Sequence, residues 1–446
     1  MHSRMNLQPE TRRPAEFACM SAQKIPHLRW YIAVLLCLSS VLTYLDRQTL
    51  SVLASTIQRE LGMSTVQYAQ ITSAFLFSYT IMYAVSGIVI DWLGTRRGLP
   101  LFLSGWSVAT MLHALANTVG QFSFCRVLLG ATQPANFAAG VKAVSEWFPM
   151  RERALAVGIF NSGTALGSMI ATPLVALIAL LLGWRQAFVV CGALGSFWVI
   201  AWYLLYQPPK SHPRLEAAER DLILSEATDA QEQGGAAVPL LRLLRMKETW
   251  GCILARVCTD PISYFLGFWI PKYLQDERGL TLAQIGYYAW IPYAALALGN
   301  IFSGAAPRYL ISRGWPLDRA RKTTMFAVSC MMPVCCLLVT RVESTALAIT
   351  LVTAMMFGHA AWGNITLPAE IFPKRVVGTV TGFGGALGGL AGAISQLYIG
   401  LVVQRLSFAP IFVACSVMYL LAFALVHILA GELGRVRIIP DGAGDA

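Results

Sequence analysis

An acid and a base stand side by side at the end of a stretch that carries no other charge. Asp46 and Arg47 close the apolar run that begins near Trp30, within the sequence Tyr44-Leu45-Asp46-Arg47. A charge at bilayer depth costs on the order of 2.5–3.5 kcal/mol, so such residues persist mainly where they pair or face an aqueous cavity. An ion pair near a helix end is one interpretation. We favour a functional site, because buried charges recur later in the chain at depths that a shared cavity would need.

The two side chains can do different chemistry. An anion that enters a low dielectric needs a fixed cation, and arginine stays charged and can hold a carboxylate through two parallel hydrogen bonds. The aspartate beside it can take up and release a proton. Arg47 therefore indicates a site for an anion, and Asp46 indicates a site for proton exchange.

Two further groups have helical spacing inside apolar runs. Arg256 and Asp260 lie four apart and could pair along one helical face, either as a structural pair near a helix end or as part of a site. Pro261 removes an amide donor there, which suits a helix that bends. His359 and Trp362 lie three apart and would share a face, and a histidine within a span is a candidate for function.

The composition shows which elements must position these residues. The 446 residues are 56% hydrophobic and 13% charged, with a mean hydropathy of +0.58, which is more apolar than a soluble domain can bury. Repeated uncharged runs of about 20 residues indicate spanning helices, whereas a barrel would show alternating segments of about ten. The net charge of +11 is concentrated in alternate loops, so we expect a protein of the lipid bilayer and no nucleic-acid partner.

We expect an all-α membrane protein with twelve transmembrane helices in two six-helix halves. The halves span residues 30–205 and 249–430, with tails at 1–29 and 431–446 and a linker at 206–248. The expected helices run at roughly 30–49, 69–90, 98–116, 121–142, 154–178, 184–205, 249–272, 285–305, 323–340, 345–366, 378–403 and 408–430. The last residues of the tenth span include the sequon Asn364-Ile365-Thr366, which should escape glycosylation there.

Lysine and arginine positions give the expected orientation. They gather in the N-terminal tail, the linker, the C-terminal tail and alternate loops, such as the one that holds Arg96 and Arg97. By the positive-inside rule, both termini and the linker are expected to be cytoplasmic, in a multi-pass protein of the cell inner membrane. Ten cysteines without a CxxC pair are interpreted as small apolar residues.

An internal repeat supports the division into halves. Glu146-Trp-Phe-Pro-Met-Arg151 and Glu370-Ile-Phe-Pro-Lys-Arg375 match at Glu, Phe, Pro and Arg with a constant offset (370 − 146 = 224). Parallel repeats point to a transporter with a site at their interface. The linker between them has a charged helical patch from Arg214 to Glu226 and then Gly234-Gly-Ala-Ala237, and we interpret it as a tether with a short surface helix.

A glycine-rich motif follows the second expected span. Gly87-Ile-Val-Ile-Asp91-Trp-Leu-Gly94-Thr-Arg96-Arg97 resembles the GxxxDxxGxRR signature of the major facilitator superfamily, in which these residues latch helix ends on the cytoplasmic side. Gly94 permits the tight turn, and Asp91 can pair with a neighbouring helix or an arginine. The resemblance implies the major facilitator fold and a gating role for the motif.

Further short motifs run along nearly the whole chain. They are Tyr44-Leu-Asp46-Arg47, Tyr79, Arg126, Ser145-Glu-Trp-Phe-Pro149, Gly158-Ile-Phe-Asn161-Ser-Gly163, Thr259-Asp260-Pro261, Phe268-Trp-Ile-Pro271, Ala320-Arg-Lys322, His359-Ala-Ala-Trp362 and Phe372-Pro-Lys-Arg375. In this order they resemble the anion:cation symporter branch of the superfamily, in particular its hexuronate and aldonate transporters.

This resemblance implies a secondary active transporter that moves a sugar-acid anion inward with protons by alternating access. In the family, the positions matching Arg47 and Tyr79 contact substrate, Arg126 belongs to the central charge network, and the position of Asp46 takes part in proton coupling. The expected substrate-binding residues are Tyr44, Arg47, Tyr79, Arg126, Gln133, Asn161, His359 and Trp362. The expected proton-coupling residues are Asp46 and Asp260, and the gating residues are Gly87, Asp91, Gly94, Arg96 and Arg97.

One position departs from the family pattern. The family commonly has an acid seven residues after the arginine of the fourth helix, on the same face, and here that position is Gln133. An amide can hydrogen-bond hydroxyls but cannot carry a proton through the cycle. Fewer coupled protons is one consequence, and a shift of that role to Asp260 or His359 is another.

The substrate expected first is glucuronate or galacturonate, with aldonates, aldarates and other small carboxylates as alternatives. We expect a monomer that needs no cofactor or metal and is driven by the proton gradient. A proton-driven drug exporter shares the glycine-rich motif, but Gly158, Gly163, Gly167 and Ser168 do not reproduce the glycine-proline antiporter signature. A membrane enzyme is disfavoured because no metal-ligand cluster, nucleophile elbow or P-loop appears in the sequence, and a non-transporting sensor is a further alternative.

Overall fold

The computed structural model describes residues 24–229, 240–372 and 374–433. Over these residues the secondary structure is helical, apart from one isolated bridge between Ile25 and Leu215. The first bundle comprises α1 (Leu28–Leu61), α2 (Thr65–Leu93), α3 (Thr95–Leu112), η1 (His113–Leu115), α4 (Val119–Thr132), α5 (Ala135–Trp147), α6 (Met150–Leu182) and α7 (Trp184–Leu205). The linker contributes η2 (Pro209–Ser211), α8 (Ala217–Asp229) and α9 (Leu240–Arg245).

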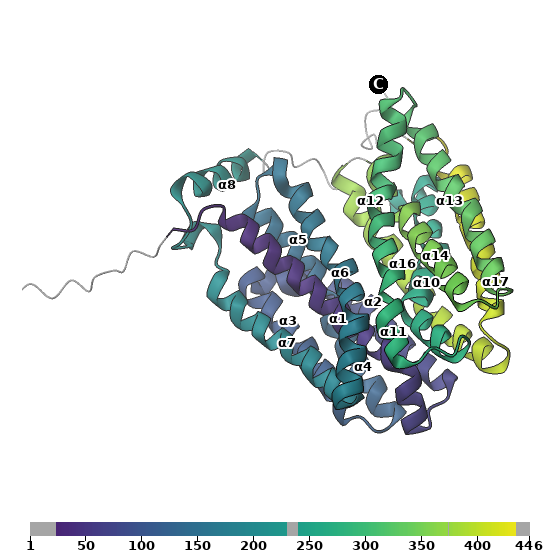
Figure 1. The fold of residues 1–446 in the computed structure, drawn as a ribbon. Coiled ribbons are helices and arrows are strands. Elements are labelled where there is room, and N and C mark those ends of the chain that lie inside the picture. The colour runs from purple at the N-terminus through teal and green to yellow at the C-terminus, as the bar shows by residue number, and fades with distance from the viewer. Residues whose placement is uncertain (1–23, 230–239, 373, 434–446) are drawn as a thin grey trace, which may run out of the picture.

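The second bundle comprises α10 (Lys247–Asp276), α11 (Leu282–Tyr288), α12 (Trp290–Ser312), α13 (Leu317–Val339), α14 (Thr345–Trp362), η3 (Asn364–Thr366), α15 (Leu367–Ile371), α16 (Lys374–Arg405), α17 (Ala409–Leu425) and η4 (Val426–Ala430). Figure 1 shows the two bundles side by side, the first in purple to teal and the second in green to yellow. They meet where α1, α2 and α6 pack against α10, α11, α12 and α16.

Helix α1 is longer than the sequence suggested. It continues to Leu61, where Gly62 ends it with a left-handed φ of 63°, whereas we expected the helix to stop near residue 49. The expectation was wrong because we interpreted the polar residues after Arg47 as the end of the membrane-spanning helix. Several of them are in fact buried against the other half, where the Ser51 hydroxyl donates to the Phe268 carbonyl at 2.9 Å.

The expected span at 121–142 is divided in two. Helix α4 ends at Thr132 and α5 begins at Ala135, with Gln133 and Pro134 still in right-handed helical geometry between them. Proline cannot donate an amide to the preceding turn, which explains the interruption.

Eight of the described helices are long and apolar enough to cross a membrane, and a ninth is counted if α2, bent by 51° near Tyr83, is taken as one span. The expected spans at 121–142, 249–272 and 285–305 are not among them. The first is interrupted at Pro134 and the second carries ionisable residues of both signs. The third is divided between α11 and α12, and α12, at 23 residues, is long enough but not apolar enough. The count of twelve therefore stays a prediction, as does the orientation of the termini.

The linker helix α8 is docked on the start of α1, next to which it lies in Figure 1. The Glu219 carboxylate accepts hydrogen bonds from the backbone amides of Leu28 and Arg29 at 3.0 and 3.3 Å and from the Arg29 guanidinium at 2.7 Å. The same guanidinium pairs with Glu152 of α6 at 2.8 Å. Residue His27 makes no side-chain cap, so Glu219 satisfies the first amides of α1 from a distant segment. The predicted charged helix of the linker is thus confirmed, while its Gly234–Ala237 segment lies outside the described residues.

Replacing Glu219 with Ala should lower the thermal stability of the detergent-purified protein by roughly 2–4 °C, because it removes a buried partner of Arg29 and uncaps α1. The matched control is Asp221→Ala, an exposed position in the same helix. Unfolding curves followed by intrinsic tryptophan fluorescence measure both variants. Equal midpoints for Glu219→Ala and wild type would show that the docking contributes nothing to stability.

Candidate functional site

A cavity with about 230 Å³ of free space lies between the two halves. From α1 and α2 it is lined by Tyr44, Arg47, Tyr79, Thr80 and Tyr83. From the second half it is lined by Arg256, Asp260, Ser263, Tyr264, His359, Asn364, Gly385 and Gly389. The cavity therefore has one arginine on each wall.

Arg47 is held among neutral groups. Its guanidinium carbon lies over the rings of Tyr44, Phe75 and Tyr79, at 4.7, 5.1 and 4.8 Å from the ring centroids. Its Nη2 donates to Oε1 of Gln133 at 3.3 Å, and its Nε has no hydrogen-bond partner among the described residues. Aromatic faces attract a cation without neutralising it, so Arg47 brings a full positive charge to the cavity wall.

Gln133 holds Arg47 in place and does not line the cavity. Its amide nitrogen donates to the Thr43 carbonyl at 3.1 Å, which leaves its oxygen facing Arg47. The interruption between α4 and α5 therefore directs a neutral acceptor at the cation.

Asp46 and Arg126 are buried, with exposed fractions of 1% and 2%, and neither lines the cavity. Neither carboxylate oxygen of Asp46 has a hydrogen-bond donor among the described residues, and Nε and Nη2 of Arg126 are unpartnered too. The nearby Thr110 hydroxyl donates to the Trp106 carbonyl instead, and Arg126 interacts with Asp46 only through its charge. The structure thus brings the predicted Arg126 within electrostatic range of Asp46, and neither residue lines the cavity.

Arg256 and Asp260 of α10 form the pair that their spacing predicted. Oδ2 of Asp260 lies 3.0 Å from Nε and 2.9 Å from Nη2 of Arg256. Asn364 donates to the other carboxylate oxygen at 3.2 Å and to the Thr259 hydroxyl at 2.7 Å. Since both partners line the cavity, this pair is part of the site.

The glycine run of α16 makes room for that pair. A Cβ at Gly388 would lie 2.3 Å from Oδ2 of Asp260, and one at Gly384 or Gly385 would lie 3.0 Å from Arg256. On the other face, a Cβ at Gly389 would lie 2.5 Å from the Thr80 hydroxyl of α2. Because these glycines have no side chains, α16 can pack closely against α10 on one face and α2 on the other.

The remaining three predicted binding residues differ in where they lie relative to the cavity. His359 lines the cavity, and its Nδ1 lies 2.5 Å from the Tyr419 hydroxyl. Trp362 is buried behind the wall, where its ring nitrogen donates to Ser329 at 2.9 Å. Asn161 is exposed on α6 and does not line the cavity.

Sequence reasoning missed five polar lining residues, Thr80, Tyr83, Ser263, Tyr264 and Asn364. Asn364 was considered only as a sequon, and the others have common residue types with no distinctive neighbours. Helical spacing could have flagged Ser263 and Tyr264, which follow Asp260 by three and four positions.

The motif predicted to gate lies at the end of α2. Asp91 forms an ion pair with Lys142 of α5 at 2.8 Å, and Gly94 makes the turn into α3 with a φ of 73°. The Thr95 hydroxyl donates to Glu146 at 3.0 Å, and the Trp202 ring nitrogen donates to the Arg96 carbonyl at 3.2 Å. Asp91 thus pairs with a neighbouring helix, the first of the two arrangements expected for it. A Cβ at Gly87 would meet nothing within 4 Å, and Arg97 is exposed.

The second copy of the repeat has a corresponding anchor. Glu370, which matches Glu146, pairs with Arg321 of α13 at 3.0 Å. Arg321 also donates to the Ser303 and Gly363 carbonyls. Each repeated glutamate therefore binds helix ends within its own half.

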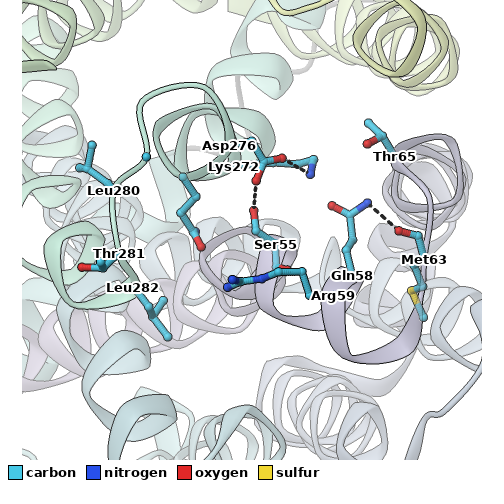
Figure 2. Close-up of a pocket in the computed structure, with 12 residues that line it drawn as sticks. Ser55, Gln58, Arg59, Met63, Thr65, Lys272, Asp276, Leu280, Thr281 and Leu282 are labelled. Atoms are coloured by element: carbon cyan, nitrogen blue, oxygen red, sulfur yellow. Dashed lines mark hydrogen bonds and ion pairs between the residues drawn. The ribbon is translucent and has the colours of Figure 1, made fainter. Parts of the chain in front are cut away.

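A larger pocket of about 530 Å³ lies where the C-terminal ends of α1 and α10 meet, shown in Figure 2. There the Ser55 hydroxyl of the first half donates to Asp276 of the second at 2.7 Å, and Lys272 pairs with the same carboxylate. The Gln275 amide also donates to the Val52 carbonyl at 3.1 Å. These contacts close the two halves at this end. We place the functional site in the smaller cavity, because it brings Arg47 of the first half and the Arg256–Asp260 pair of the second half to one space.

Over the described residues, no group of three or more His, Cys, Asp or Glu side chains is arranged to hold a metal ion. The charged side chains that line the cavity are Arg47 and the Arg256–Asp260 pair, and His359 is a further ionisable group of the lining.

Comparison with known proteins shows which proteins the chain is similar to. The model of the Major Facilitator Superfamily matches residues 36–396. The hexuronate transporter of Escherichia coli K12 is 35% identical, covering 95% of this chain and 99% of that protein. The galacturonate transporter of Dickeya chrysanthemi is 38% identical over 64% of this chain and 83% of its own length. The D-galactonate transporter of Escherichia coli O6:H1 is 29% identical over 94% and 99%.

Solved structures share the fold at low sequence identity. The inward open conformation of the xylose transporter from E. coli has a TM-score of 0.70 at 13% identity and covers 91% of this chain and 97% of its own. A bacterial homologue of the human lysosomal transporter Spinster, in an inward-facing and occupied conformation, has a TM-score of 0.69 at 15% identity and covers 90% and 95%.

Replacing Gly388 with Ala should destabilise the protein, because the new methyl group would lie 2.3 Å from Asp260 and overpacking costs about 1–3 kcal/mol. Gly382→Ala in the same helix is the matched control, since a Cβ there meets nothing within 4 Å and alanine favours a helix by about 1 kcal/mol. Thermal unfolding in detergent should give a lower midpoint for the Gly388 variant and an unchanged or higher midpoint for the control. If both variants have the same unfolding midpoint as the wild type, the contact between α16 and Asp260 is not tight.

Proposed function

We propose that this chain, which belongs to the Major Facilitator Superfamily, carries a sugar-acid anion across the membrane through the cavity between its halves. Its curated relatives are transporters of sugar acids, and it is a multi-pass membrane transporter and not an enzyme. The observation that carries the proposal is Arg47, a cation on the cavity wall whose neighbours are aromatic rings and an amide. Such a cation needs an anion from outside the protein.

The first substrate to consider is a hexuronate such as glucuronate or galacturonate. The relative that is 35% identical over nearly the whole chain is named a hexuronate transporter, and a second is named a galacturonate transporter. Aldonates, aldarates and other small carboxylates are the alternatives, and a D-galactonate transporter is among the relatives.

The site offers a place for each part of such a molecule. The substrate carboxylate would take the unpartnered Nε of Arg47 and replace Gln133 at Nη2, which gives the two parallel bonds that arginine favours. Tyr44 and Tyr79 flank that position and would pack against the sugar ring. Hydroxyls would bond to polar groups of the opposite wall, such as Ser263 and Asn364. Arg126, which is buried and does not line the cavity, would add its charge to the same region of the first half.

Proton coupling is proposed for Asp46. An ionised carboxylate that is 1% exposed and has no donor among the described residues is costly, so a proton on Asp46 would stabilise one stage of the cycle. Release of that proton would leave a carboxylate beside Arg126. Asp260 is the weaker candidate because it already has Arg256 as a partner. One proton per monoanion would move no net charge, in keeping with a neutral Gln133.

The remaining features of the proposal follow the sequence. The transporter would have twelve spans with both termini in the cytoplasm, lie in the inner membrane as a monomer, and use the proton gradient without a cofactor. The halves would rock about the cavity, with the contacts of Ser55 and Asp276 opening at one end and those of the Asp91 motif rearranging at the other.

Arg47→Ala should abolish uptake while the protein still inserts, because losing one partner of a buried charged contact costs about 2–5 kcal/mol. Arg126→Ala should do the same, since it removes the second cation of that region. Arg47→Lys is the control that keeps the charge without the planar fork, and it should retain weak binding. Labelled hexuronate uptake into proteoliposomes measures all three. Uptake of a neutral sugar that survives both alanine substitutions would rule out an anion site at these arginines.

Asp46→Asn should permit counterflow of labelled substrate but abolish uphill uptake, because exchange needs the binding site and accumulation needs the proton cycle. The pH gradient should drive wild-type uptake, and membrane potential should affect it weakly. Two protons per monoanion would instead move one positive charge, which adds about 2.3 kcal/mol of driving force per 100 mV. Solid-supported membrane recordings measure this current. Accumulation by the Asn variant down an imposed pH gradient would exclude Asp46 as the proton carrier.

A further inference from the structure

The wall opposite Arg47 presents a cation that is already occupied. Arg256 is the other arginine or lysine among the described residues that line the cavity, and Asp260 contacts it through Nε and Nη2 at 3.0 and 2.9 Å. The side chains of the pair are 18% and 10% exposed, so both remain accessible from the cavity. One wall thus offers a net positive charge and the other a balanced pair.

The pair is fixed by its surroundings. Nη1 of Arg256 donates to the Thr381 carbonyl of α16 at 3.2 Å, and Asn364 donates to the free oxygen of Asp260. Gly385 and Gly388 leave just enough space for the two side chains against α16. Arg256 therefore cannot leave Asp260 to meet a ligand without giving up several contacts.

We propose that Asp260 is a specificity residue that restricts the site to sugar acids with one carboxylate and excludes dicarboxylates. This inference rests on the proposed function, with the first carboxylate bound at Arg47. Arg47, Tyr264 and the Arg256–Asp260 pair line one cavity of about 230 Å³, so a ligand held at Arg47 shares that space with the pair.

The chemistry at the far end of the ligand then decides between substrates. A hydroxyl group can donate to an oxygen of Asp260 or accept from Asn364, so the neutral end of a hexuronate finds partners. A second carboxylate would approach the Asp260 carboxylate, where the local cation is already neutralised. Repulsion between like charges in a low dielectric is a strong form of selection against the wrong ligand.

A comparison of ligands tests this in the wild-type protein. Binding of three probes is measured by isothermal titration on purified transporter at pH 7: a hexuronate, a hexarate and the monoamide of that hexarate. The hexuronate and the monoamide should bind with similar affinity, and the hexarate, which differs from the monoamide by one charged group, should bind about tenfold more weakly or worse. A hexarate that binds as tightly as its monoamide overturns the inference. If none of the three binds, the proposed function fails instead.

A pair of variants tests the role of Asp260 itself. Asp260→Asn should free Arg256 and improve hexarate binding about tenfold relative to hexuronate. Adding Arg256→Gln to that variant should remove the gain, because the second carboxylate then has no cation. An Asn variant that still binds hexuronate but keeps the wild-type ratio would show that Asp260 has only a structural role. If the Asn variant does not fold, the ligand comparison in the wild type still tests whether the site excludes dicarboxylates.

Discussion

The structure depends on keeping one arginine charged, buried and without an acidic partner. Arg47 is 7% exposed, yet its neighbours are three aromatic rings and the amide oxygen of Gln133. A cation in such a place is stabilised only partly, because aromatic faces and amides supply partial charges. The remaining charge is available to a substrate, and the long helix α1, buried between the halves, holds the guanidinium at the cavity wall.

The arginine of the opposite wall, Arg256, is paired with a carboxylate. This ion pair needs space that a helix surface covered by side chains does not normally provide. The glycines of α16 provide it, since a methyl group at Gly388 would overlap the Asp260 carboxylate. The same helix meets α2 across the interface at Gly389, so close packing between the halves and the position of the ion pair depend on one run of glycines. Movement of α16 would therefore disturb the cavity wall and the interface together.

Contacts at the ends of the helices define how the halves are held. At the end where α1 and α10 terminate, hydrogen bonds such as Ser55 to Asp276 cross between halves, whereas Glu146 and Glu370 bind helix ends inside their own halves. The first kind must break if the cavity opens at that end, and the second can persist while each half moves as a body. Docking of α8 through Glu219 fixes part of the linker to the first half.

The sequence alone determined the class of protein, its division into halves and the identity of the central cation. These follow from local properties: apolar run length, the 224-residue repeat, and a charged pair in an apolar run, together with motifs read in order. The pairing of Arg256 with Asp260 was also predictable, because both lie on one helix and the period fixes their separation. The family, expected from its motifs, is confirmed by the match over residues 36–396.

Only the tertiary structure decided which residues meet across helices. It turned Gln133 toward Arg47, buried Arg126 within electrostatic range of Asp46, and brought Asn364 to Asp260. It also extended α1 beyond Arg47, because the polar residues that looked like a helix end are buried by the other half. Helical periodicity specifies the face on which a side chain lies, but the partner of that face is set by the packing of helices that are distant in sequence.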